Sequence, residues 1–367
     1  MKCACIVLQK RIGAENQALY SVLKTLGVNG FPMQELRMLP QNDEQCVCSA
    51  IKGLKGETDY LFLLCDKTAL PIAKRYLTGI YEESALRGDF GGACIYEENK
   101  NCLFLFSADE TDTGKGYVLN ACIPFLQKKN RMRYEKLVVR TIGASAERIE
   151  ALLAETRRLG GDFLQCYHVQ KYAEDVIEIS YGENAPKMLL DDVMRLLVDG
   201  LGDTVYALND VSVEEQLVTL LKLRRRKISV AESFTGGGIA KRITSVSGAS
   251  EVYFEGLNTY DERSKIKRLG VSEYTLNMSG AVSEQTAYEM AYGLLKTGDC
   301  DIAIATTGLA GPKTDRSMLP VGLCYLAVGF EDRVYVYKYK FDGNREEITQ
   351  TAINYALYLA YKQLKSV

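Results

Sequence analysis

The stretch that decides the fold is residues 228–238, which read ISVAESFTGGG. Residues 228–231 have the length and apolar character of a buried strand. The Ser-x-Thr-Gly-Gly turn that follows predicts a helix over residues 237–244, because Ser and Thr favour helix N-termini and glycine permits tight turns. A strand that passes through such a turn into a helix is typical of an α/β fold. It places Ser233 at a strand end, where α/β proteins bind their ligands.

The flanking segments extend this pattern to residue 367. A connecting helix over residues 212–225 begins with a capping box, in which Glu215 follows Ser212 by three residues. Tyr253 and Phe254 are expected to be core residues. We therefore predict a three-layer α/β domain over residues 211–367. Its predicted strands after the first are 303–306, 321–328 and 334–341, and its predicted helices after the first are 283–296 and 346–365.

Two further units are predicted upstream. Residues 1–132 alternate strand-like and helix-like runs, which favours an α/β domain with a parallel sheet; the family resemblance given below implies that this domain is shortened. Residues 133–210 read as a small α+β module. The predicted strands are 4–8, 59–65, 101–107, 136–140, 175–180 and 204–208, and the predicted helices are 17–26, 46–54, 145–159 and 185–198.

Composition argues against several classes of function. The net charge of −2 gives no electrostatic reason to expect nucleic acid or an anionic membrane as a partner. No apolar run approaches the length of a membrane span. The eleven cysteines include two CxC pairs and no CxxC pair, so we interpret them as reduced, buried residues of a cytoplasmic protein rather than as a zinc site.

The single histidine, His168, limits the possible catalytic bases. A Ser-His-Asp triad in the C-terminal region would need His168 to reach across a domain boundary. A base for Ser233 is therefore expected among Lys, Tyr, Asp and Glu side chains. The alternative for Ser233 is a purely structural helix cap.

Six short blocks follow one another in the last third of the chain. They are AESFTGG at 231–237, TYDERSK at 259–265, GAVS at 280–283, GLAGP at 308–312, PVG at 320–322 and GNR at 343–345. In this order they resemble the C-terminal domain of the CinA family, the competence/damage-inducible proteins that include nicotinamide-nucleotide amidases. Three features depart from the family pattern: Phe234 replaces a Cys, Asn344 replaces an Asp, and residues 313–319 lack a glycine-rich run.

The resemblance extends upstream more weakly. Residues 1–132 occupy the place of the family's molybdopterin-binding-like domain. The motifs of that domain are missing at residues 9–12, 65–71 and 106–109, so its pyrophosphatase activity is not expected here. The densest acidic set in this region is Asp109, Glu110 and Asp112, which we interpret as a solvated loop.

The resemblance implies hydrolysis of the carboxamide of nicotinamide mononucleotide by a homodimer. No cofactor or metal is expected, because the sequence has one histidine and no Cys/His ligand cluster in its C-terminal region. Ser233 would attack the amide carbon, and Lys265 in its neutral form or Tyr260 would take the proton. Thr307 would either orient the amide or lend its hydroxyl to the proton path. Backbone N–H groups around Thr235, Gly236 and Gly237 would form the oxyanion hole. The other expected substrate-binding residues are Gly308, Ala310, Gly311 and Arg345.

Two questions stay open at this point. Lys265 needs a lowered pKa to act as a base, and burial or repulsion by Arg263 and Lys267 could lower it. Glu232 is expected to be a structural acceptor, and it is the next candidate for the base. The rival functions are a non-catalytic regulatory protein that keeps the fold and a nucleotide pyrophosphatase acting through the N-terminal domain.

Overall fold

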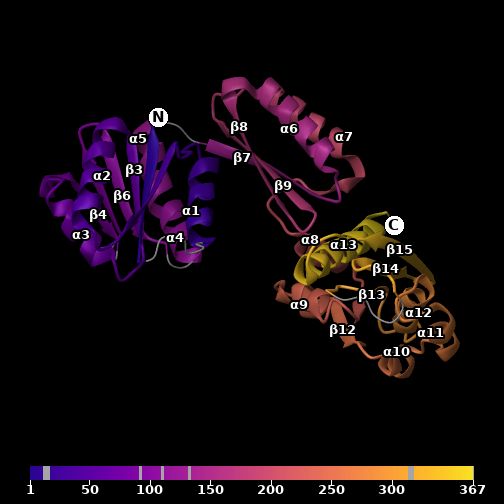
Figure 1. Cartoon of the computed structure of the whole chain (residues 1–367). Helices are drawn as coiled ribbons and strands as arrows, with labels where there is room; N and C mark the ends of the chain where they lie inside the picture. The colour runs from indigo at the N-terminus through magenta and orange to yellow at the C-terminus, as the bar shows by residue number, and fades with distance from the viewer. Residues whose placement is uncertain (11–16, 91–92, 109–110, 131–133, 313–317, 367) are drawn as a thin grey trace. The chain divides into compact units, whose positions relative to one another are not determined.

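The structure is a computed structural model that describes residues 1–10, 17–90, 93–108, 111–130, 134–312 and 318–366. In these ranges the strands form three sheets (Figure 1), which confirms the α/β fold class. The chain divides into two compact units. The first comprises Met1–Leu137, Arg157–Tyr167 and Glu178–Asp191, and the second comprises Val138–Thr156, His168–Ile177 and Asp192–Val367. The predicted domain boundaries at residues 132 and 210 stay a prediction.

The N-terminal sheet has the strand order β2-β1-β3-β6-β5-β4. Its first four strands are parallel, as predicted, whereas β5 and β4 extend it in antiparallel fashion. The strands are β1 (Cys3–Gln9), β2 (Glu35–Pro40), β3 (Tyr60–Cys65), β4 (Leu86–Phe90), β5 (Ala93–Glu98) and β6 (Asn101–Ser107). The helices are α1 (Gln17–Val28), α2 (Glu44–Glu57), α3 (Leu70–Thr78), α4 (Thr111–Tyr117) and α5 (Ile123–Asn130).

The period of two along β1 explains one CxC pair. Cys3 and Cys5 face the same side of the sheet as Val7 and pack against α1 and α5, while Ile6 faces the α2 and α3 side. None of the eleven cysteines forms a disulfide, and eight of them are buried. Both cysteines of this pair therefore act as small apolar residues of the core.

The second sheet has the order β10-β7-β9-β8. The predictions located three of its strands and both of its long helices, but not β8. The strands are β7 (Tyr134–Ile142), β8 (Leu164–Lys171), β9 (Glu174–Gly182) and β10 (Val205–Ala207), and the helices are α6 (Ala146–Gly160) and α7 (Lys187–Leu201).

The C-terminal sheet has the order β12-β11-β13-β14-β15. Strand β11 lies parallel to β12 on one side and to β13 on the other, while β14 and β15 are antiparallel additions. The chain order therefore reverses at β11, which makes its carboxyl end a topological switch point. The strands are β11 (Ile228–Glu232), β12 (Tyr253–Asn258), β13 (Ile302–Gly308), β14 (Leu323–Phe330) and β15 (Arg333–Lys340).

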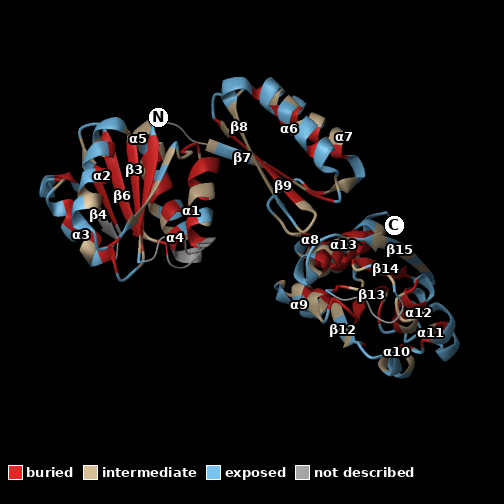
Figure 2. Ribbon diagram, viewed as in Figure 1, coloured by how far each residue is buried: buried red, intermediate tan, exposed pale blue. Residues whose placement is uncertain are grey.

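Helices cover both faces of this sheet, and Figure 2 shows the buried interior between them in red. Ile228 and Val230 pack with α8, α9 and α13, whereas Ala231 packs with α12 on the opposite face. This is the predicted three-layer arrangement. The helices are α8 (Val213–Arg224), α9 (Gly238–Ser245), α10 (Glu262–Leu269), α11 (Glu273–Ser279), α12 (Glu284–Leu295) and α13 (Arg345–Lys365).

Two local predictions had opposite outcomes. The capping box is confirmed, because the Ser212 and Glu215 side chains each bond the other residue's backbone N–H. The core assignment of Phe254 is wrong, since this side chain is 49% exposed. Strand β12 lies at the edge of the sheet and its residues alternate between half-buried and exposed, so every second side chain faces solvent.

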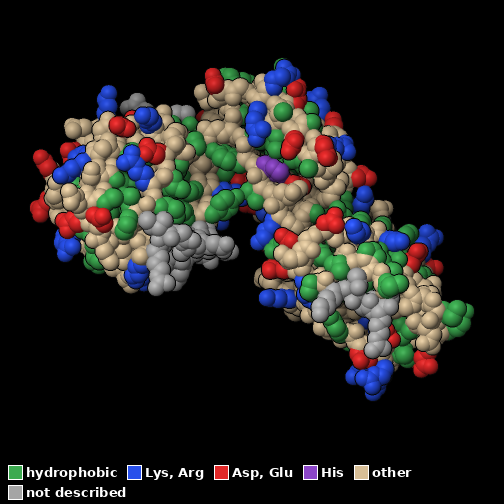
Figure 3. All heavy atoms as spheres, viewed as in Figure 1, with side chains coloured by type: hydrophobic (Ala, Val, Ile, Leu, Met, Phe, Trp, Pro, Cys, Tyr) green, Lys and Arg blue, Asp and Glu red, His purple; other side chains and the backbone are tan. Residues whose placement is uncertain are grey.

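The surface carries charges of both signs. On the face shown in Figure 3, Lys and Arg side chains are interspersed with Asp and Glu side chains, in keeping with the net charge of −2. Over the described ranges, none of the helices is long and apolar enough to cross a membrane.

Candidate functional site

Ser233 follows the last residue of β11, at the switch point of the C-terminal sheet. Gly236 and Gly237 complete the turn into α9 with φ values of +63° and +95°, which favour glycine over residues that carry a Cβ. A Cβ atom added at either glycine would meet nothing within 4 Å. The turn therefore needs glycine for its backbone conformation, and it leaves open space beside these two glycines.

Glu232 holds the beginning of α9. Its carboxylate accepts hydrogen bonds from the backbone N–H groups of Gly237 (3.1 Å), Ile239 (3.1 Å) and Ala240 (2.9 Å). A carboxylate is favoured at a helix N-terminus by the unpaired N–H groups and the helix dipole. The interpretation of Glu232 as a structural acceptor is confirmed, and its oxygens are already engaged rather than available to take a proton from Ser233.

Lys265 is the side chain that meets Ser233. It lies on the inward face of α10, is only 1% exposed, and places Nζ 2.9 Å from Ser233 Oγ. Nζ also donates a hydrogen bond to the backbone carbonyl of Thr259. A carbonyl can only accept, so this bond orients the amine and leaves the lone pair of a neutral Nζ available to the Ser233 hydroxyl.

The pKa of Lys265 is lowered from 10.5 to about 8, because burial removes water from the ammonium form, while Glu262 and Asp261 oppose the shift. The suggested repulsion by neighbouring cations does not account for it. Arg263 is exposed and its Nε pairs with Asp261 Oδ1 at 3.0 Å, and Lys267 is exposed. Desolvation is therefore the main reason that this amine can act as a base near neutral pH.

Tyr260 belongs to a second cluster. Its side chain is 63% exposed, and its hydroxyl accepts a hydrogen bond from Arg345 Nη2 at 3.1 Å. Arg345 Nη1 donates to the Gly311 carbonyl at 2.7 Å. Among the hydrogen bonds of the described residues, Tyr260 contacts neither Ser233 nor Lys265. The Thr259–Tyr260 peptide connects the two clusters, because Thr259 accepts from the lysine and Tyr260 from the arginine.

The two threonines at the end of β13 have different partners. Thr306 Oγ1 lies 2.8 Å from the Thr235 hydroxyl and 3.5 Å from the Ser233 backbone N. Thr307 donates its hydroxyl to the carbonyl of Ala281 at 2.5 Å, so it holds the GAVS block. Sequence reasoning selected Thr307 and missed Thr306; the alternation of side chains along a strand signals that only one of the pair can face Thr235.

The backbone of the turn narrows the choice of oxyanion donors. The N–H of Gly236 donates to the Ser233 carbonyl, and the N–H of Gly237 donates to Glu232. These two groups are therefore not free to bind an oxyanion in this conformation, contrary to our expectation. Of the N–H groups in the described turn, those of Phe234 and Thr235 have no hydrogen-bond partner, and both residues are buried.

The remaining predicted residues support the loops around the site. Gly308 packs closely on β14, since a Cβ there would come within 2.5 Å of Cys324 Cβ. Ala310 is buried next to Gly311. His168 lies in β8, with Nε2 2.8 Å from Asp175 Oδ1, so its partner is not Ser233.

Among the described residues, no group of three or more His, Cys, Asp or Glu side chains could hold a metal ion. Asp109 and Glu110 of the acidic set lie outside the described residues, and so does the side chain of Asp112. Residues 313–317 of the loop after Pro312 also lie outside them.

Comparison with known proteins points to one family. Residues 210–364 match the profile of the CinA C-terminal domain. A competence-damage inducible protein of Caldicellulosiruptor saccharolyticus is 37% identical over 245 residues, which are 66% of this chain and 59% of that protein. A CinA-like protein of Kosmotoga olearia is 39% identical over 180 residues, which are 49% of this chain and 42% of that protein. The chain thus spans about three fifths or less of these relatives.

A solved structure of a competence/damage inducible protein is also similar to part of this chain. The structure of the competence/damage inducible protein CihA from Agrobacterium tumefaciens is 36% identical to the aligned region. The alignment covers 42% of this chain and 96% of that one, with a TM-score of 0.39.

Proposed function

Residues 210–364 belong to the CinA C-terminal domain family, and from that premise we propose that this region is a serine-type amidase acting on nicotinamide mononucleotide. The observation that carries the proposal is the buried Lys265 amine, 2.9 Å from Ser233 Oγ, with a pKa lowered to about 8. A weak hydroxyl nucleophile needs an adjacent base, and this pair provides one without histidine.

The reaction would proceed in two halves. Neutral Lys265 takes the Ser233 hydroxyl proton as Oγ bonds to the carboxamide carbon, and the resulting ammonium donates that proton to the departing nitrogen, which leaves as ammonia. Water then attacks the ester on Ser233, again with Lys265 as base. This step returns the hydroxyl group and releases nicotinic acid mononucleotide.

The surroundings of the pair support the other roles. The N–H groups of Phe234 and Thr235 would stabilise the oxyanion, because donors already in place need no reorganisation during the reaction. Arg345 stands at the first turn of α13, and its guanidinium group would bind the substrate's 5′-phosphate. Tyr260 would then position Arg345 and contact the substrate rather than serve as the base. The homodimer implied by the family stays part of the proposal, to be tested by sedimentation of the full chain.

The test is ammonia release from nicotinamide mononucleotide by the full chain. The wild-type protein should release ammonia and Ser233→Ala should lose at least about 1000-fold in rate. Ser264→Ala, one residue before Lys265 on α10, is the matched control and should keep the wild-type rate. A folded wild-type protein that releases no ammonia would favour the non-catalytic alternative, and an active Ser233→Ala variant would exclude the serine mechanism.

A further inference from the structure

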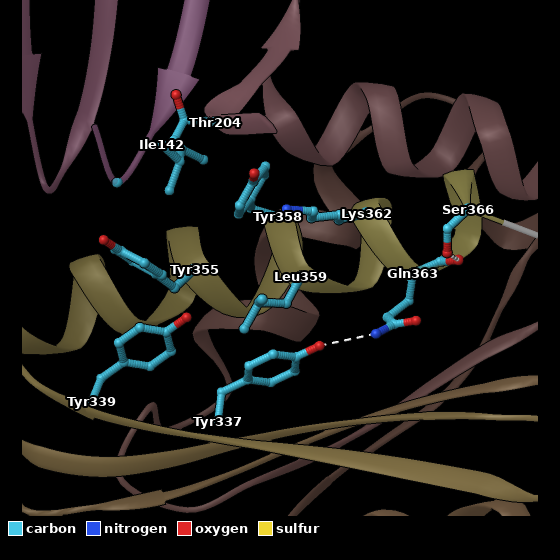
Figure 4. A pocket seen from close by; sticks show the side chains of 11 residues that line it. Ile142, Thr204, Tyr337, Tyr339, Tyr355, Tyr358, Leu359, Lys362, Gln363 and Ser366 are labelled. Carbon is cyan, nitrogen blue, oxygen red and sulfur yellow. Dashed lines mark hydrogen bonds between the residues drawn. The ribbon is translucent and has the colours of Figure 1, made fainter. Parts of the chain in front are cut away.

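A second cavity lies away from Ser233, within the C-terminal compact unit. It has a volume of about 460 Å³, within the usual range of small-molecule sites. Four tyrosine rings surround it, two from β15 and two from α13, and Figure 4 shows Lys362 and Gln363 toward one side of the opening. The tyrosines are Tyr337, Tyr339, Tyr355 and Tyr358.

The four hydroxyl groups are not equivalent. Tyr337 accepts a hydrogen bond from Gln363 at 2.9 Å, and Tyr358 donates to the Asp203 carbonyl. The hydroxyls of Tyr339 and Tyr355 have no hydrogen-bond partner within the described part of the chain. Burial raises the pKa of Tyr339 to about 12 and also raises that of Tyr355, so both groups keep their protons at neutral pH and can donate to a ligand.

Gly143 leaves room for the Tyr355 side chain because it has no Cβ atom. This glycine has a φ of +82°, and a Cβ atom on it would come within 2.6 Å of the Tyr355 hydroxyl oxygen. The rings of Tyr339 and Tyr355 pack at 4.8 Å between centroids with a 54° angle between their planes. The cavity therefore has a packed aromatic wall with two hydroxyl groups on it, and aromatic walls of this kind favour planar ring systems.

One cationic side chain lines the cavity. Lys362 is the ionic side chain among the lining residues, all of which are described. Its Nζ lies 3.3 Å from Asp203 Oδ2, but the Asp203 side chain is 90% exposed and the Lys362 side chain 48% exposed. Solvent screens such a pair strongly, so an incoming anion can compete for the ammonium group.

We propose that this cavity binds a small anionic aromatic molecule of the purine mononucleotide class. The aromatic ring lies against the tyrosines, the Tyr339 and Tyr355 hydroxyls bond its polar edge, and its phosphate or carboxylate approaches Lys362.

This site is separate from the Ser233 site and does not depend on the proposed amidase activity. The cavity contains none of the residues around Ser233. Along α13, Tyr355 and Lys362 stand 10 and 17 residues beyond Arg345, which corresponds to about 15–26 Å at the rise of an α-helix.

Calorimetric titration of the full chain tests the ligand class. Adenosine 5′-monophosphate should bind, adenosine should bind at least about fivefold more weakly because it lacks the anion, and inorganic phosphate should not bind measurably because it lacks the ring. Benzoate tests whether a carboxylate replaces the phosphate. Absence of measurable mononucleotide binding, or equal binding of the mononucleotide and adenosine, would overturn the proposal.

Single-residue variants test whether the mononucleotide binds in this cavity. Lys362→Gln should weaken mononucleotide binding about fivefold and Tyr355→Phe about threefold, while Lys365→Gln, on the same helix outside the cavity, should bind as the wild type does. Circular dichroism and the unfolding temperature check each fold, and Lys362→Gln carries the test alone if Tyr355→Phe does not fold. Binding that survives Lys362→Gln unchanged and is lost in Arg345→Gln would place the nucleotide at the Ser233 site and refute the proposal.

Discussion

Near each terminal sheet, a lysine contacts the hydroxyl group of a residue that lies just after a strand. In the N-terminal sheet, Lys10 follows β1 and its Nζ lies 3.1 Å from Thr68 Oγ1. Near the C-terminal sheet, Lys265 Nζ on α10 lies 2.9 Å from Oγ of Ser233, the residue that follows β11. The distances are nearly equal, but the Lys10 side chain is 63% exposed and Lys265 is 1% exposed.

Burial is what separates the two pairs. Lys10 stays in water, with Asp66 Oδ2 3.7 Å from its Nζ. Lys265 has lost its water, which lowers its pKa to about 8. A lysine–hydroxyl contact at a strand end is therefore not by itself a nucleophile and base; the desolvation of the amine makes it one.

The largest expected effect separates the two lysines in catalysis. Lys265→Met keeps most of the apolar stem but removes the base, so ammonia release from nicotinamide mononucleotide should fall by about 10²–10⁴-fold. Lys10→Met should keep the wild-type rate. Near-normal turnover by a folded Lys265→Met protein would remove the distinction between the two pairs.

The carboxylates that accept backbone N–H groups beside the two pairs should differ in their contribution to stability. Glu232 is buried and its carboxylate accepts three backbone N–H groups, so Glu232→Gln should cost about 2 kcal/mol, or about thirtyfold in local opening. Asp66, whose side chain is 28% exposed, accepts from the Ala69 N–H, and Asp66→Asn should cost less than about 0.5 kcal/mol because the amide oxygen can still accept this bond. Residue-resolved hydrogen exchange at Ala240 and Ala69 measures both; equal changes would contradict the comparison.

The pH dependence of the rate should report the lowered pKa of Lys265. The base acts in its neutral form, and the neutral fraction grows as the pH rises. The rate should therefore increase through pH 8, reach a plateau above about pH 9.5, and at pH 7 be about tenfold below that plateau. A pH–rate profile of kcat/KM measures this, and a rate that is flat between pH 6 and 9 would argue against Lys265 as the base.

The smallest effect concerns Tyr260. Because its hydroxyl contacts Arg345 and not Lys265, Tyr260→Phe should raise KM about fivefold with a smaller change in kcat. Steady-state kinetics of the single variant and of the double variant with Lys265→Met decide the point. A loss of kcat as large as that of Lys265→Met would restore Tyr260 as a member of the base.

The strand, turn and helix that carry Ser233 were predictable from the sequence, because they depend on local patterns. Residues 228–238 specify a strand, a glycine turn and a helix, and this order alone places Ser233 at a strand end. The helix cap at Ser212 and Glu215 was predictable for the same reason, since both partners lie within one turn. By contrast, Phe254 is exposed because β12 lies at the edge of its sheet, and the apolar character of the residue does not reveal that position.

The partners of Ser233 depended on the tertiary structure. The spacing of residues 259–265 brings both Tyr260 and Lys265 near the site, but only the packing of α10 decides which side chain turns inward. Thr306 and Thr307 are equally close in sequence, and the face of β13 on which each lies decides which one reaches Thr235. Local sequence sets the backbone conformation and its period, whereas the pKa of Lys265 depends on water excluded by segments distant along the chain.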